Sequence, residues 1–110
     1  MGRGREPDLN ALLGQGAYYT GDMAFEGRVR LDGHFSGRVY TEERLEIGEL
    51  GLMEGEVDAA EVVIAGRMKG RLKVRRRLVI ESTAHVEGEI DARLLEIEAG
   101  ATIRATVNVG

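Results

Sequence analysis

Seven cationic side chains between positions 67 and 77 form the densest charged run of the chain. They are Arg67, Lys69, Arg71, Lys73, Arg75, Arg76 and Arg77. Such a run could bind nucleic-acid phosphates through charge alone. However, no aromatic residue lies among them for base stacking, acidic segments precede and follow the run, and the net charge is −4. We therefore expect these cations to pair within the chain, with nucleic acid excluded as the main partner.

Catalytic and metal-binding chemistry finds little support in the residue types. His34 and His85 are separated by two intervening units of the repeat described below. This places them more than roughly 14 Å apart, which is too far to share a metal. We expect both histidines at surface corners. The chain has no cysteine, which rules out thiolate metal sites and fits a reducing cytoplasm. No nucleophile–base pair or phosphate loop occurs. The residues predict no enzyme and no cofactor.

The N-terminal segment has the composition of a small membrane anchor. It carries these leucines and arginines: Leu9, Leu12, Leu13, Arg3 and Arg5. The leucines would enter the membrane interface while the arginines lie near anionic headgroups. Alternatively, the segment is a disordered leader, or its leucines fold back over the first unit of the repeat. No secretory signal or bilayer-spanning run is visible. We predict residues 1–16 to be a flexible tail that includes a candidate anchor.

All these side chains must be positioned by a repeat that fills the rest of the chain. Its unit is apolar–x–small–x–apolar, centred on the small residues Gly37, Gly55, Gly70, Gly88 and Ala105. About eight residues after each of the first four centres comes an apolar–x–apolar pair, such as Leu45 and Ile47. Both patterns alternate with period two, which is typical of strands with one face inward. A period of about 17 residues predicts stacked coils.

The repeat specifies a fold class. We predict an all-β, single-domain parallel β-helix, or solenoid, over residues 17–110, with about five to six three-sided coils at roughly 4.8 Å per level. Only 5% of residues are aromatic, so the triangular core must be aliphatic. The small centres permit a corner or a close backbone approach. We expect the variation in repeat length at one corner, where the connection at residues 64–66 is the short one.

Outward-facing positions support parallel stacking. Charges change sign from coil to coil in four columns: Arg38, Glu56, Arg71 and Glu89; Glu54, Lys69, Glu87 and Arg104; Asp58, Lys73 and Asp91; and Arg44, Glu61 and Arg77. In-register parallel strands would otherwise place like charges side by side. Each exposed pair contributes about 0.2–1 kcal/mol. The columns therefore set the register more than they stabilise the fold.

The two ends of the predicted stack show no capping helix. A solenoid without caps exposes backbone groups and core side chains at both ends, which predicts end-to-end assembly of the chain with itself. The residues expected in this polymer interface are Met23 and Phe25 at one end and Ile103, Ala105, Val107 and Val109 at the other. Stacking in either direction buries the same ends, so filament polarity stays open. Arg104 places a cation on the last coil.

The segment from Phe25 to Gly37 resembles the first coil of bactofilins, and the units at 51–57 and 98–101 are similar to their repeats. The resemblance covers about residues 13–109; Ala105 stands where the family usually has a final glycine. It implies a right-handed β-helix that polymerises without nucleotide into bacterial cytoskeletal filaments. It also implies a cytoplasmic protein attached by a short N-terminal tail to the inner face of the membrane. Cell-wall and polar proteins would then be candidate partners.

The leading alternative is an acyltransferase built on a left-handed β-helix of hexapeptide repeats. Apolar or small residues recur every six positions at Ile47, Met53, Ala59 and Ala65, but the next position is Arg71. Such enzymes carry further elements that complete a substrate site, and none is recognised here. We therefore predict a non-enzymatic cytoskeletal scaffold.

Overall fold

Nine β-strands and no helix make up the part of the chain that the computed structural model describes, residues 11–110. The strands are β1 (Ala11–Leu13), β2 (Tyr18–Phe25), β3 (Val29–Leu31), β4 (His34–Thr41), β5 (Arg44–Ile47), β6 (Leu52–Ile64), β7 (Arg67–Ile80), β8 (His85–Ile97) and β9 (Thr102–Val109). Every pairing between them is parallel. The predicted all-β parallel solenoid is therefore confirmed.

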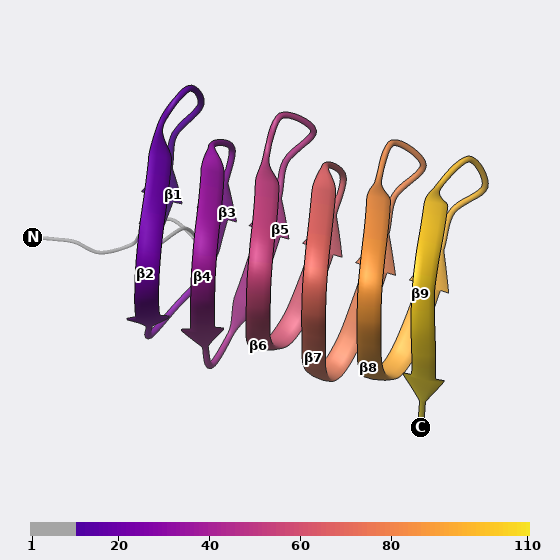
Figure 1. The fold of residues 1–110 in the computed structure, drawn as a ribbon. Helices are drawn as coiled ribbons and strands as arrows, with labels where there is room; N and C mark the ends of the chain where they lie inside the picture. Colours follow the sequence, from indigo (N-terminus) through magenta and orange to yellow (C-terminus); the bar gives the residue numbers. More distant parts are fainter. Residues whose placement is uncertain (1–10) are drawn as a thin grey trace, which may run out of the picture.

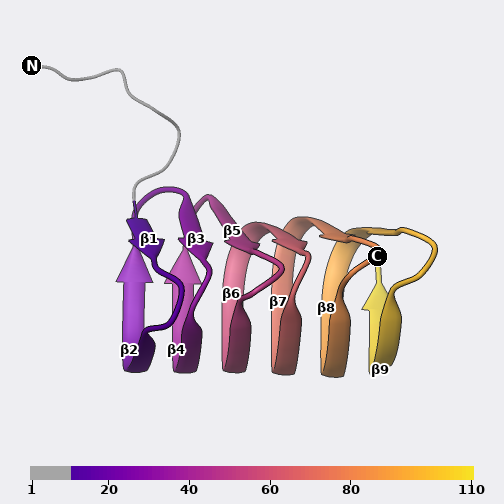
Figure 2. The ribbon, with the colours of Figure 1, turned by 90° about the horizontal axis from the view of Figure 1, so that it is seen from above.

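The strands form two ladders that run the length of a rod (Figure 1). In the first, β2, β4, the beginnings of β6, β7 and β8, and β9 pair in that order. In the second, β1, β3, β5 and the ends of β6, β7 and β8 pair likewise. Each ladder has six levels, and Figure 2 shows the levels side by side with the first and last coils at opposite ends.

A column of glycines bends the first ladder and gives each coil its third side. Gly37, Gly55, Gly70 and Gly88 lie in register and have φ values between 122° and 137°, a range that L-residues with a side chain rarely adopt. A Cβ added to Gly70 would lie 1.9 Å from the carbonyl oxygen of Gly55. The column thus requires glycine for its conformation and for its close stacking. Ala105 continues the column without a positive φ.

Coil length varies at two corners, whereas we predicted variation at one. The predicted difference at residues 64–66 is present, because β6 and β7 are joined by two residues and the neighbouring connections are longer. The corner between the ladders also varies. Ala60 alone separates the paired segments in one coil, whereas Arg75 and Arg76 separate them in the next. The alternating pattern of the strands does not reveal this difference in coil length, because the extra residue is inserted as a β-bulge.

Arg75 uses this bulge to connect three successive coils. Its Nη1 donates to Asp58 Oδ1 at 2.5 Å, and its Nη2 donates to the carbonyl oxygen of Thr41 at 2.8 Å. The guanidinium carbon lies 5.3 Å from the ring centroid of Tyr40. Charge-assisted hydrogen bonds of this kind are stronger than neutral ones. Thr41 is itself buried and donates to the carbonyl oxygen of Gly27, so the corner is fixed by polar contacts.

Replacing Arg75 by alanine is expected to destabilise the solenoid by about 1–3 kcal/mol, because two hydrogen bonds and a cation–π contact are lost. The matched control is Arg76→Ala, since Arg76 is exposed and makes no ion pair with the described residues. Its effect should stay within about 0.5 kcal/mol. Urea unfolding of the two variants measures the difference. Equal effects would show that the Arg75 contacts add no stability.

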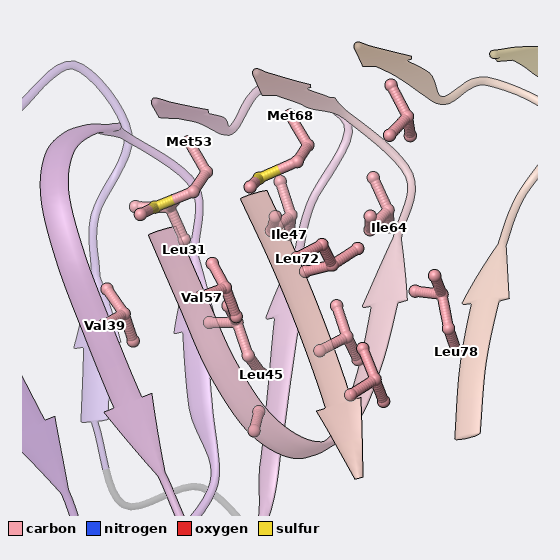
Figure 3. Packing of buried hydrophobic residues seen from close by; sticks show 14 of the residues in the cluster. Leu31, Val39, Leu45, Ile47, Met53, Val57, Ile64, Met68, Leu72 and Leu78 are labelled. Atoms are coloured by element: carbon pink, nitrogen blue, oxygen red, sulfur yellow. The ribbon is translucent and has the colours of Figure 1, made fainter. Parts of the chain in front are cut away.

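The core is a stack of aliphatic columns. Leu31, Ile47, Ile64 and Ile80 occupy one column of the second ladder and are each at most 1% exposed. Figure 3 shows Met53 and Met68 on successive coils of the first ladder, both pointing into the interior. Phe35 is the one fully buried aromatic residue of the described chain. An aliphatic core therefore fills the interior of the coils, as predicted.

The first strand lies inside the segment that we predicted as a tail. β1 pairs with β3 so that Leu13 lies opposite Leu31, and Ala11 and Leu13 pack against the core. A short apolar strand is favoured here because the outer edge of β3 would otherwise leave backbone groups without partners. The first coil accordingly begins at Ala11. The remaining tail prediction, for residues 1–10, lies outside the described residues.

Candidate assembly surfaces at the two ends of the solenoid

The last coil exposes side chains of a type that every inner coil buries. One column of the first ladder shows this, with exposed fractions of 3% for Val39, 2% for Val57, 0% for Leu72, 1% for Ile90 and 39% for Val107. Val107 therefore occupies a core position that lacks a covering level in the described structure. The same holds for Val109, which is 55% exposed, while its partner Ala92 is 1% exposed.

Part of this end surface was missed by the sequence analysis. β9 covers only the first half of β8, so the second half has no partner on its outer side among residues 11–110. Ile97 is consequently 51% exposed, whereas Ile80 in the same column is fully buried. Leu95 is half-buried beside it. Their column membership was visible in the repeat, but their exposure follows from the missing strand over the second half of β8 among residues 11–110.

The opposite end is formed by β1 and β2. The predicted residues Met23 and Phe25 are half-buried there and pack against the core, as do Tyr19 and Leu13. Tyr19 pairs with Phe35 and thus begins a core column. Its hydroxyl oxygen accepts a hydrogen bond from the Gly14 backbone N–H at 3.2 Å. Tyr19 is an end residue that the repeat pattern could have identified from its column, whereas Leu13 lies on the short strand β1.

Both end surfaces also present strand edges. β2 pairs only with β4, and β9 pairs only with β8, within the described chain. Among residues 11–110, no strand pairs with the outer N–H and C=O groups of either edge, and such groups can accept a further parallel or antiparallel strand. The usual protections of an edge, proline and inward-pointing charge, are missing from β2 and β9. Ile103 and Ala105 complete the apolar face of the C-terminal edge.

The terminal strands of the first ladder, β2 and β9, carry little outward charge, whereas the uncovered second half of β8 carries the exposed residues Arg93 and Glu96. Thr106 and Asn108 end two columns that alternate in sign through the inner coils. Arg104 is the one charged residue of β9, and Asp22 is the one charged residue of β2. Along the first ladder, a further coil stacked on either end would therefore meet little like-charge repulsion. Apolar side chains, open strand edges and low charge together make each end suited to stacking.

The basic run lies on one coil between two acidic coils, and some of its cations pair with them. Arg71 Nε lies 3.0 Å from Glu89 Oε1, and Arg77 Nη2 lies 3.4 Å from Glu96 Oε2; Arg75 pairs with Asp58 as described. Lys69 and Lys73 make no ion pair within 4.0 Å among the described residues. The columns are thus in register, while ion pairing along them is partial.

A further ion pair lies on the second ladder, at β3 and the residue that follows it. Arg30 Nε lies 3.0 Å from Asp32 Oδ2, and this hydrogen bond raises the pKa of Arg30 above its ordinary value. Arginine is charged at any physiological pH in either case. The pair therefore leaves the charge of Arg30 unchanged.

The two histidines stand in one column, separated by Leu52 and Arg67. His34 Nε2 lies 2.6 Å from Glu54 Oε1, and its ring meets the Tyr18 ring edge-on with centroids 4.5 Å apart. His85 is exposed. No cluster of three His, Cys, Asp or Glu residues with metal-binding geometry occurs among residues 11–110. The histidines thus lie at the surface corner where the sequence placed them.

Of the candidate anchor residues, only Leu12 and Leu13 lie among the residues that the structure describes. Leu12 projects outward from β1 and is 57% exposed, while Leu13 packs on the core. Leu9, Arg3 and Arg5 lie outside the described residues. Among residues 11–110, no helix has the length and apolar character needed to cross a membrane.

Comparisons with known proteins bear on the whole solenoid. The family model described as "Bactofilin: Polymer-forming cytoskeletal" matches residues 11–108, which is all but the last residue of the two ladders. No curated protein and no solved structure matches the chain.

Proposed function

The chain belongs to the bactofilin family of polymer-forming cytoskeletal proteins, and we propose that it polymerises by stacking its two end surfaces. The observation that carries this proposal is the rise in exposure along a single core column, from 1% at Ile90 to 39% at Val107. The contacts that hold one coil on the next within the chain can be repeated between chains. Polymerisation then extends the solenoid.

Each end surface carries enough apolar side chains to support association. Fully burying one exposed Val, Leu or Ile side chain contributes about 1.5–3 kcal/mol. Each end offers several partly exposed apolar residues: Leu95, Ile97, Ile103, Val107 and Val109 at one, and Leu13, Tyr19, Met23 and Phe25 at the other. The association cost is about 4–15 kcal/mol, and backbone hydrogen bonds between edges add to the gain. Assembly therefore needs no further energy source.

We propose that assembly is accordingly independent of nucleotide and that the chain acts as a non-enzymatic scaffold. The polymer contact consists of apolar side chains and strand edges, which require no hydrolysis to associate. Electron microscopy of the purified chain, treated with apyrase to remove nucleotides, tests this. Filaments should appear at micromolar concentration and should be unchanged by added ATP or GTP. Filaments that form only after nucleotide is added would overturn the proposal.

Membrane attachment is the second part of the proposed function. The N-terminal segment would attach the polymer to the inner face of the cytoplasmic membrane through Leu9 and Leu12, with Arg3 and Arg5 near anionic headgroups. Leu12 supports this because its side chain is exposed on β1, whereas Leu13 is engaged in the core. One such anchor binds weakly, but a polymer carries many copies, and avidity strengthens the attachment.

Removal of residues 1–9 is expected to reduce co-sedimentation with anionic vesicles by at least tenfold, because most of the anchor is lost while β1 stays intact. The measurement compares the pelleted fraction with and without vesicles at equal polymer content. Leu12→Ser is a second variant that weakens the anchor without shortening the chain, and its loss should be smaller. Equal binding of the full and shortened chains would exclude the N-terminal segment as the anchor.

A further inference from the structure

One side of the rod has a regular charge pattern that stacking of the ends does not use. It lies between the glycine corner and the Arg75 corner, and we call it the second facet. Its outward residues form two columns in register: Asp22, Arg38, Glu56, Arg71, Glu89 and Thr106; and Ala24, Tyr40, Asp58, Lys73, Asp91 and Asn108. Apart from Asp58, which is half-buried, all of them are exposed.

The charge of the second facet alternates by level. From the first level to the sixth, the net charges of the two columns together are −1, +1, −2, +2, −2 and 0. Alternation over an even number of levels has a geometric consequence. A two-fold axis perpendicular to the rod, between levels three and four, places level two opposite level five and level three opposite level four. Every such charged pair is of opposite sign.

The other simple arrangement is unfavourable. Two rods that run parallel without an axial shift would place each level opposite itself, so that like charges meet along the whole facet. The charges alone therefore favour the antiparallel arrangement over the parallel one. A two-fold contact of this type uses the same patch on both copies and is self-complementary.

Both halves of the second facet carry a shallow hollow. A shallow hollow of about 390 Å³ covers levels one to three, between Asp22 and Asp58. Another hollow of about 390 Å³ covers levels four to six, between Arg71 and Asn108. The two-fold axis places one hollow opposite the other, so the lateral contact rests on charge rather than on complementary shape. Tyr40, which is 40% exposed at the first hollow, would face level five of the second copy, where Asp91 can accept a hydrogen bond.

We propose that the second facet is a lateral contact surface for a second, antiparallel copy of this chain. The strip measures roughly 29 by 13 Å from six strands and four residues per strand. It is thus less than half of the about 800 Å² per partner that is typical of a stable pair. Single rods should pair only transiently. Lasting lateral association rests on the proposed polymerisation, because successive chains in two neighbouring filaments repeat the contact and add avidity.

Salt dependence and a charge reversal test the lateral contact. At 50 mM NaCl, wild-type filaments should associate laterally and pellet at low speed, and at 500 mM they should separate, since ions screen exposed charges. The double variant Arg71→Glu with Lys73→Glu places −2 opposite −2 at the centre of the contact. Its low-speed pellet at 50 mM should fall at least fivefold, while its high-speed pellet, which reports end-to-end polymer, stays unchanged.

The matched control reverses two charges on the same coil but on the neighbouring facet, Arg67→Glu with Lys69→Glu. This control should retain lateral association at 50 mM NaCl. An equal loss in both double variants, or no loss in the second-facet variant, would overturn the assignment. Thermal unfolding of both variants checks that each remains folded.

Cross-linking provides a readout that does not depend on filaments. The chain has two lysines, Lys73 on the second facet and Lys69 outside it. A mixture of ¹⁴N- and ¹⁵N-labelled chains at 50 mM NaCl is treated with a carbodiimide, which joins lysines to carboxylates in contact. Mixed-isotope links between Lys73 and Asp58 are expected at least fivefold above those from Lys69. Mixed links that favour Lys69, or none from Lys73, would contradict the proposal even if the chain fails to polymerise.

Discussion

Val107→Arg is expected to abolish polymer formation while leaving the solenoid folded. In the isolated chain Val107 is 39% exposed, so an arginine there can extend its charged end into water. In a stacked junction the same position would be covered as Leu72 and Ile90 are, and their exposed fractions are at most 1%. Burying the charge costs several kcal/mol. At about 1.4 kcal/mol per factor of ten, the critical concentration should rise at least a hundredfold.

Asn108→Arg is the matched control, because it adds the same charge one residue further along β9, where the side chain points outward on the second facet. It should polymerise like the wild type. High-speed sedimentation over a concentration series gives the critical concentrations, and circular dichroism should give melting temperatures within a few degrees of each other. Wild-type polymerisation by the Val107 variant would show that the C-terminal surface does not form the junction.

Gly70→Ala is expected to disrupt the fold itself. Its Cβ would lie 1.9 Å from the Gly55 carbonyl oxygen, and its φ of +131° is strained for any residue with a side chain. The coils on both sides hold the backbone in place, so neither problem is easily relieved. We expect a destabilisation of about 3–5 kcal/mol, measured by urea unfolding in the Val107→Arg background, where assembly does not interfere.

Gly21→Ala separates the effect of stacking from that of backbone strain. Gly21 also has a positive φ, +117°, but a Cβ there would meet no atom within 4 Å. The cost should be only about 1–2 kcal/mol. Ala105 supports this expectation, since it occupies the same column at the other end without a positive φ. Equal losses for the two variants would mean that close coil stacking at the glycine column is unimportant.

The sequence was sufficient for the register of the solenoid because several independent columns agree. Small residues, apolar pairs and alternating charges each recur with the coil, and any slip by one residue would turn the apolar side chains outward. Thus the predicted partners Glu56 and Arg71, or Gly55 and Gly70, are partners in the structure. The glycine corner could also be predicted, because only glycine tolerates both the conformation and the close contact.

Other features could not be read from the repeat. β1 has three residues, too few to show an alternating pattern, and it forms because β3 offers an open edge. Arg75 and Arg76 form an insertion whose contacts depend on where the corner directs the side chains. Leu95 and Ile97 have the pattern of core residues, and their exposure depends on whether a further level covers them. The column of a residue therefore predicts its neighbours on adjacent coils. Its exposure depends on whether a further coil covers it, and its ion pairs depend on side-chain rotamers.

The central claim, that chains continue the solenoid by stacking their end coils, is tested most directly by the axial repeat of the polymer. Power spectra from electron cryomicroscopy, or fibre diffraction, should show a meridional reflection near 4.8 Å, because the strands stay perpendicular to the filament axis. With six levels per chain, the axial rise should be about 29 Å per subunit, or a repeat of about 58 Å if neighbours alternate in direction. A 4.8 Å reflection away from the meridian, or a longer rise per subunit, would contradict end-to-end stacking.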